Sequence, residues 1–238
     1  MCHCSEGNIM KNQYFGDVRD LFKYDLILRI IQETSSTNRF LYIPMLTEND
    51  NRGDGNKIDY NKAKAGTQNK DLMTYLKKCV NEDRKNITEI KHYFKLKGIK
   101  IYIHNELFIH RNRKSYFDRI IKELFSPSLI FVDPDNGLKV KRSNDKHLLY
   151  HEANDLYNRM DKDSILMIYQ HFPRENHTEY LCGRTNELKE LTEDLPIYIS
   201  DNEIIFFLLT KNDELKRQLE RIINRYKRDY PKLIIGPL

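Results

Sequence analysis

The sequence lacks the features of membrane-spanning and disulfide-stabilised proteins. Its longest apolar runs, such as residues 204–209, are far shorter than the roughly 18 to 20 residues that a spanning helix needs. It has four cysteines in 238 residues, without the spacing of a disulfide framework, and no apolar signal segment precedes them. These absences predict a reducing, cytoplasmic setting and no membrane partner.

Two common phosphate-cradling motifs are missing as well. No G-x-x-x-x-G-K-[ST] occurs, and no G-x-G-x-x-G follows a predicted strand, so nucleotide binding in those two styles is unsupported. The composition, with 39% hydrophobic and 32% charged residues, supplies enough apolar side chains for a core and enough charge for a soluble surface. The net charge of +5 favours an anionic partner only mildly, and we expect one domain over residues 1–238.

The N-terminus carries one cluster of soft metal ligands, Cys2-His3-Cys4. It would hold a metal ion only if a second ligand pair came close in space, and no matching CxxC or HxxxH lies downstream. We favour the alternative that this stretch is a short extension ahead of a second possible start at Met10.

Apolar periodicity predicts helices that alternate with strands. Helices are expected at residues 17–33, 70–84, 88–97, 115–125, 147–160, 178–192 and 213–228. Strands are expected at residues 40–46, 99–104, 128–132, 164–169, 197–200, 204–209 and 233–235. Because most of these strands are apolar on both faces, the pattern predicts an α/β fold with a mostly parallel sheet covered on both sides. The turn at residues 200–203 predicts an antiparallel edge hairpin, and residues 61–98 predict a helical insertion outside the sheet.

Polar residues gather directly after three predicted strands, in residues 46–55, 133–137 and 170–174. Ligands of open parallel sheets bind outside the carboxyl ends of the strands, so these three loops are expected to share one pocket. The second loop reads Asp-Pro-Asp-Asn-Gly. Its proline and glycine fix a backbone that would aim two carboxylates and the proline carbonyl into a crevice, although the same residues also form ordinary turns. Its candidate residues are Asp133, Pro134, Asp135 and Asn136.

The other two loops carry further candidates. The first could wrap backbone amides around an anion or a ribose, or could be a plain surface turn, and its candidate residues are Thr47, Asp50, Gly53, Asp54 and Gly55. The third places an amide, an imidazole, an aromatic ring and a guanidinium together, which suits a base or a phosphate, unless its histidine is purely structural. Its candidates are Gln170, His171, Phe172 and Arg174.

Three more residues are candidates for substrate binding. Tyr14 stands near the start of the first helix, where Asp17 is either a simple N-cap or a part of the crevice. Lys139 begins a basic segment just after the Asp133 loop, where it is placed to hold a nucleic-acid backbone.

These motifs resemble those of an uncharacterised prokaryotic family. They are Tyr-Phe-Gly-Asp at residues 14–17, Met-Leu-Thr and Gly-Asp-Gly at 45–47 and 53–55, Asp-Pro-Asp-Asn-Gly-Leu at 133–138, and Tyr-Gln-His-Phe-Pro-Arg at 169–174. The resemblance covers residues 11 to about 174 and implies no particular activity.

The chain also distantly resembles Rossmann-type methyltransferases that act on the adenine amino group in DNA or RNA. Their Asp/Asn-Pro-Pro-Tyr/Phe motif corresponds to Asp133-Pro134-Asp135-Asn136, so an asparagine replaces the stacking ring. The resemblance implies a methyltransferase-like sheet, S-adenosylmethionine held by the loop after the first strand, and a flipped base whose amino group contacts Asp133 and Pro134. Asp133, Asp135, Asn136 and His171 would then be the catalytic residues.

Two other classes of function fit the same residues. Asp54, Asp133, Asp135 and His171 could instead bind Mg²⁺ or Mn²⁺ in a nuclease or phosphodiesterase, with Lys139 or Arg174 on a phosphate. A catalytically silent binding module on an enzyme-like fold is the third alternative.

Overall fold

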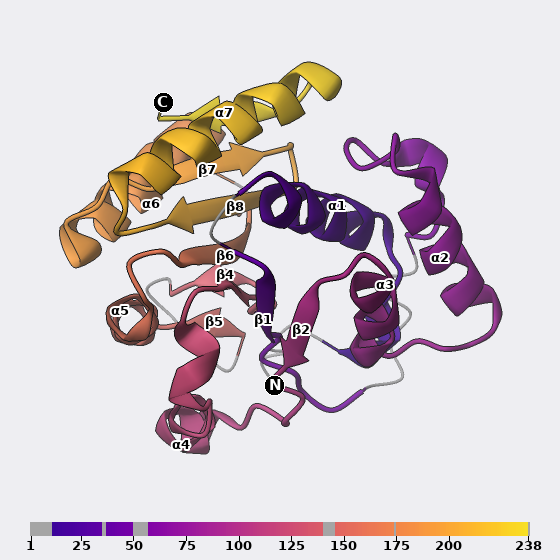
Figure 1. Ribbon diagram of the computed structural model, residues 1–238, viewed down its shortest axis with the longest axis horizontal. Coiled ribbons are helices and arrows are strands. Elements are labelled where there is room, and N and C mark those ends of the chain that lie inside the picture. The colour runs from indigo at the N-terminus through magenta and orange to yellow at the C-terminus, as the bar shows by residue number, and fades with distance from the viewer. Residues whose placement is uncertain (1–10, 35–36, 50–56, 140–145, 174, 238) are drawn as a thin grey trace, which may run out of the picture.

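The computed structural model describes residues 11–34, 37–49, 57–139, 146–173 and 175–237. Its central feature is a seven-stranded sheet in the order β2-β1-β3-β6-β8-β7-β9 (Figure 1). Strands β2, β1, β3 and β6 are mutually parallel, whereas β8 is antiparallel to both β6 and β7, and β9 is antiparallel to β7. The strands are β1 (Arg39–Ile43), β2 (Lys100–Ile103), β3 (Leu129–Val132), β6 (Ile165–His171), β7 (Ile197–Ser200), β8 (Ile204–Leu209) and β9 (Ile234–Gly236).

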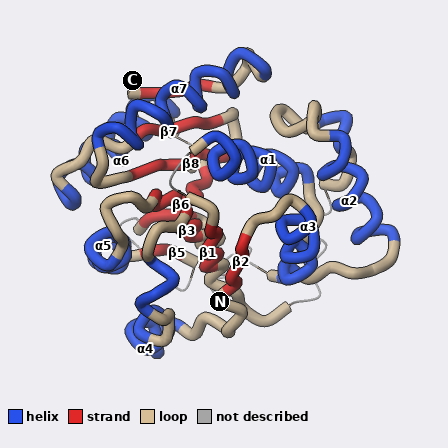
Figure 2. Tube along the Cα trace, in the orientation of Figure 1, coloured by secondary structure: helices blue, strands red, loops and turns tan. Residues whose placement is uncertain are grey.

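Helices cover both faces of this sheet (Figure 2). One face packs against α1 (Val18–Glu33), α2 (Lys70–Asn81), α3 (Ile90–Leu96) and α7 (Asp213–Asp229). The other face packs against α4 (Arg113–Asp118), α5 (Tyr150–Arg159) and α6 (His177–Thr192). Alternate strand residues supply the two cores: Phe131 faces the first and Ile130 the second. Within the described residues, no helix is both long and apolar enough to cross a membrane.

The α/β class and the mostly parallel sheet with an antiparallel edge hairpin are confirmed. Residues 61–98 are mainly helical and contain no strand. They also contribute to the core of the domain, because Leu72 of α2 and Phe94 of α3 are both fully buried in it. The Phe94 ring lies 4.9 Å from the Phe40 ring of β1, centroid to centroid. This helical segment therefore lies outside the sheet and packs on β1 and β2.

The main departures from the predicted elements concern two helices. Residues 147–160 were expected to form one helix, but β5 (His147–Leu148) pairs in parallel with β4 (Gly137–Leu138), and α5 begins only at Tyr150. The Glu152 side chain accepts a hydrogen bond from the Leu149 N–H at 2.8 Å and so marks the helix start. The helix expected at residues 115–125 divides into α4 and a 3₁₀ turn at Lys122–Phe125.

Candidate functional site

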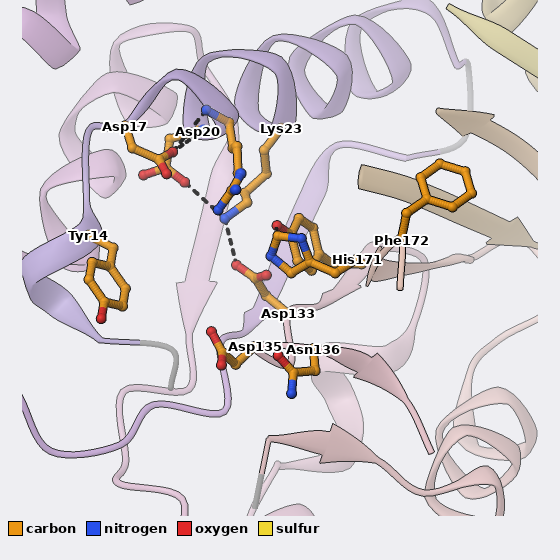
Figure 3. Close-up of a pocket in the computed structure, with 11 residues that line it drawn as sticks. Tyr14, Asp17, Asp20, Lys23, Asp133, Asp135, Asn136, His171 and Phe172 are labelled. Atoms are coloured by element: carbon orange, nitrogen blue, oxygen red, sulfur yellow. Dashed lines mark hydrogen bonds and ion pairs between the residues drawn. The ribbon is translucent and has the colours of Figure 1, made fainter. Parts of the chain in front are cut away.

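A polar cavity of about 290 Å³ lies at the carboxyl ends of β3 and β6, beside the start of α1 (Figure 3). These segments meet because β3 and β6 are adjacent parallel strands, so their following residues emerge at one sheet edge. The cavity is lined by Tyr14, Asp17, Arg19, Asp20, Lys23, Asp133, Asp135, Asn136, Tyr169, His171 and Phe172.

A buried ion-pair chain forms the floor of this cavity. Lys23 Nζ donates to Asp20 Oδ1 and to Asp133 Oδ2, each at 2.8 Å, and all three side chains are at most 5% exposed. Tyr42 donates its hydroxyl hydrogen to the same Asp133 oxygen at 2.7 Å. Burial acts to lower the pKa of Lys23, but Asp133 and Asp20 outweigh it and raise that pKa well above its usual value. The lysine is therefore a fixed cation that joins α1 to the end of β3.

Two carboxylate oxygens at the cavity lack a hydrogen-bond donor among the described residues, Asp133 Oδ1 and Asp135 Oδ2. Both atoms are buried from solvent. Burial raises the pKa of Asp135 to about 7, against the opposing effect of Lys146. It also raises the pKa of Asp133, against the effect of Lys23. Buried acceptors without donors are unusual in folded proteins. A ligand with N–H groups would therefore be stabilised here, because it would donate hydrogen bonds to these two oxygens.

The start of α1 contributes a second pair of acids. Asp17 caps the helix by accepting from the N–H groups of Arg19 at 2.9 Å and Asp20 at 3.0 Å. Burial, followed by the nearby Asp20 charge, raises the pKa of Asp17 to about 7. Asp17 is thus both the N-cap and a cavity residue, so the two alternatives considered for it are compatible.

Aromatic and imidazole rings complete the lining. The Tyr169 hydroxyl lies 2.9 Å from His171 Nε2. Burial, followed by the Arg19 charge, lowers the pKa of His171 to about 3, so the imidazole is neutral near pH 7. Phe172 stacks on His177 with centroids 3.9 Å apart. In Figure 3, Tyr14 and Phe172 stand on opposite sides of the carboxylates.

Two of the candidate residues, Gln170 and Pro134, do not line the cavity, and Gln170 supports the Asp133 loop. Gln170 is 2% exposed, and its side chain accepts from the Leu138 N–H at 2.7 Å and donates to the Asn136 carbonyl at 2.8 Å. Gly137 adopts φ +101°, and a Cβ there would lie 2.3 Å from the Gln170 amide. Pro134 is buried and is not among the lining residues. Gln170 therefore holds the loop that aims Asp133 and Asp135.

The remaining candidates do not reach this cavity or lie outside the described residues. Thr47 and the exposed Lys139 are described and are not in the lining. The candidates that lie outside the described part of the chain are Asp50, Gly53, Asp54, Gly55 and Arg174, together with the Cys2-His3-Cys4 cluster. The cavity thus unites the second predicted loop and the start of α1 with the end of β6, which extends two residues beyond its predicted end at Tyr169 and includes Gln170 and His171.

Sequence reasoning missed three charged cavity residues on α1 and one polar residue on β6, namely Arg19, Asp20, Lys23 and Tyr169. The sequence did contain an indication that Lys23 is buried, because it lies among the apolar residues Leu21, Phe22 and Tyr24 of a predicted helix. A lysine at such a position needs a buried partner. Asp20, three residues earlier, is one of its two partners.

No group of three or more His, Cys, Asp or Glu side chains suited to a metal ion occurs within the described residues. Asp54, one of the ligands considered for Mg²⁺ or Mn²⁺, is outside them. No protein-family model and no curated protein matches this sequence.

Proposed function

We propose that the protein is a nucleic-acid-modifying enzyme of the S-adenosylmethionine-dependent methyltransferase type, and that its cavity receives the amino group of a base. The observation that carries this proposal is the pair of buried acceptors without donors in the described part of the chain, Asp133 Oδ1 and Asp135 Oδ2. An exocyclic amino group has two N–H donors and no need of a formal charge, so it would satisfy such acceptors.

The place of Asp133 in the fold supports the same proposal. It follows β3, which lies beside β1 near the middle of the sheet, and an antiparallel hairpin of β7 and β8 lies beyond β6. The amino-methyltransferases that the sequence resembles place their acidic motif after a central strand of a similar sheet. Asn136 replaces their stacking ring, but Tyr14 and Phe172 bring aromatic rings to the cavity from other segments.

The residues of the site would divide the chemistry of amino-group modification between them. Asp133 would accept an amino hydrogen while Lys23 and Tyr42 fix its other oxygen. Asp135, with a pKa of about 7, can hold or release a proton near neutral pH and would take the proton that the amino group loses. Neutral His171 would act through Tyr169, because its Nε2 is hydrogen-bonded to the Tyr169 hydroxyl and so holds that cavity residue in place.

The described residues do not form a recognisable cradle for S-adenosylmethionine. Thr47 lies outside the cavity lining, and the glycine-containing loop expected to hold the cofactor is not in the described part of the chain. The proposal therefore rests on the base-binding side of the site, and the cofactor is the part that experiment must establish.

The test is incorporation of labelled methyl groups from S-adenosylmethionine into DNA or RNA by the full-length chain. We expect incorporation that Asp133→Asn and Asp135→Asn each reduce by about 10²-fold or more, as for removal of a group that contacts the reacting centre. Asp118→Asn, a change to an exposed acid of α4, is the matched control and should retain activity. Strand cleavage that requires Mg²⁺ or Mn²⁺, or binding without any reaction, would contradict the proposal and favour the nuclease or the silent module.

A further inference from the structure

A cluster of cations around one carboxylate lies beside the cavity, next to the lining residues Arg19 and Phe172. Arg19 lines the cavity and donates to Glu203 Oε2 at 3.3 Å. Lys57 contacts the same oxygen at 3.0 Å, and Lys64 lies 3.5 Å from the other oxygen of Glu203. We call Arg19, Lys57 and Lys64 the cationic rim. Lys64 also approaches Asp201, at 3.9 Å, but that pair is longer.

The rim differs from the floor of the cavity in exposure. The side chains of Asp20, Lys23 and Asp133 are at most 5% exposed, whereas those of Arg19 and Lys64 are 28% and 31% exposed. Acceptors that lack a donor among the described residues therefore lie inside the cavity, and the more exposed cations of the rim lie beside it. A nucleotide unit has the complementary arrangement, because its base bears N–H donors and its phosphate bears negative charge.

The chain holds Glu203 in place at this position. It ends the turn between β7 and β8, where its backbone N–H donates to Asp201 Oδ1 at 2.6 Å. Its carbonyl accepts from the N–H of the cavity residue Phe172 at 3.0 Å. Burial opposes ionisation of Glu203, but Lys57, Lys64 and Arg19 outweigh it and lower its pKa to about 2. The carboxylate is therefore ionised across the neutral range and occupies the centre of the rim as an anion would.

One nitrogen of the Arg19 guanidinium could make a further hydrogen bond to a phosphate. Arg19 Nε is buried and lacks a hydrogen-bond partner among the described residues, although the guanidinium NH2 group is paired with Glu203. A phosphate oxygen could accept from Nε together with a terminal nitrogen, the two-bond geometry that arginine favours with phosphates.

We infer that Arg19, Lys57 and Lys64 bind a backbone phosphate of a nucleic-acid strand, and that Glu203 occupies this phosphate site when the strand is absent. The inference rests on the proposed function, since it makes the rim the anchor for the strand whose base enters the cavity. In this view the Glu203 carboxylate competes with the phosphate for the three cations, so removing the carboxylate should strengthen binding of the strand. An ion pair that only stabilises the fold would give no such gain.

The experiment measures binding of a short fluorescein-labelled single-stranded oligonucleotide to the full chain by anisotropy, without S-adenosylmethionine. We expect Glu203→Gln to tighten binding about two- to fivefold, the range of an exposed ion pair. We expect Lys57→Ala to weaken binding and to reduce the slope of log affinity against log salt by about 0.7, the value for one phosphate contact on a single strand.

The control is Asp118→Asn, which removes one negative charge from a pair with Lys114 on exposed α4. Equal tightening by this control would mean that net charge alone acts, and it would overturn the inference. Weaker or unchanged binding by Glu203→Gln, with an unchanged melting temperature, would overturn it as well. Competition by inorganic phosphate as strong as that by the oligonucleotide would show a site for free phosphate instead of a strand.

This measurement is independent of the proposed reaction. If the Glu203 and Lys57 variants behave as expected but no methyl transfer occurs, the phosphate site stands and the proposed function fails. If methyl transfer occurs while the rim variants bind like the unaltered chain, the proposed function stands and the phosphate site fails.

Discussion

Lys23 and Asp133 are 110 positions apart in the chain, yet their side chains form a buried ion pair of 2.8 Å. Lys23 belongs to α1 and Asp133 follows β3, so this pair fixes the first turns of the helix against the carboxyl end of an inner strand. The same lysine binds Asp20, which in turn accepts from the Gly16 N–H at 2.9 Å. The geometry of the cavity therefore depends on one lysine that both carboxylates share.

Replacing this lysine should destabilise the fold strongly. Lys23→Met leaves two buried carboxylates without their cation, and loss of one partner of a buried pair typically costs about 3–5 kcal/mol. Chemical denaturation of the unaltered and variant chains measures the difference. Lys114→Met, which breaks an exposed pair with Asp118, should change stability by only about 0.5 kcal/mol. A loss below about 1 kcal/mol for Lys23→Met would mean that water or protons replace the lysine easily.

Asp135 should make the folded state less stable as the pH rises. Its pKa rises from 3.8 to about 7 in the folded protein, so between these values the folded state binds more protons than the unfolded state. The contribution of the Asp135 carboxyl group to the stability of the folded state is fully present below about pH 4 and is lost as the pH rises through 7. Asp135→Asn should therefore raise the free energy of unfolding by about 2 kcal/mol at pH 8 and change it little at pH 4. The gain at pH 8 is smaller than the full pKa shift implies, because water partly reaches the group.

Denaturation at the two pH values tests this difference. Asp118→Asn provides the control, since it also replaces one acid by its amide but at a side chain that is 52% exposed. An equal effect of Asp135→Asn at both pH values would show that burial does not disfavour its charged form.

Gly137 should tolerate no side chain. Its positive φ already strains any other residue, and a Cβ would lie 2.3 Å from the Gln170 amide that braces the Asp133 loop. Gly137→Ala should lower stability by about 2–4 kcal/mol, since strain and a displaced hydrogen-bonded amide add together. Gly98 also has a positive φ, +77°, but a Cβ added there would meet no described atom within 4 Å, so Gly98→Ala isolates the strain.

Gly98→Ala should cost only about 1–2 kcal/mol. Thermal melts of both alanine variants provide the comparison. If the two substitutions cost the same, Gln170 does not hold the loop as tightly as its hydrogen bonds indicate.

Phe172 should contribute to binding through stacking on a base. Phe172→Ala is expected to weaken oligonucleotide binding by about 1–3 kcal/mol, the range for loss of one base–aromatic stack. An abasic oligonucleotide of the same length keeps the phosphates and lacks the bases, so its affinity should be unaffected. Equal losses for both oligonucleotides would show that Phe172 acts on the shape of the site and not on a base.

Local sequence was sufficient to place most of the fold. Strands at residues 197–200 and 204–209 occupy the predicted ranges, and α1 starts one residue after its predicted start. Apolar periodicity and capping residues act within a few positions of each other, so a single segment carries the whole signal. The two-residue strands β4 and β5 were missed, because their pairing joins Gly137 to His147, ten positions later, and such short strands leave no periodic pattern.

The candidate site divides in the same way. The sequence by itself predicted that Asp133, Asp135 and His171 lie together, because polar residues directly after predicted parallel strands are expected at one sheet edge, and all three line the cavity. Only the tertiary structure decided that Lys23 shares their cavity and that Gln170 turns to the loop backbone. These roles depend on which groups, distant in the sequence, become the hydrogen-bond or ion-pair partners of each polar atom. In a buried site water cannot replace a missing partner, so the nearest polar group determines the role of each side chain. A linear pattern contains no information on that competition until the chain has folded.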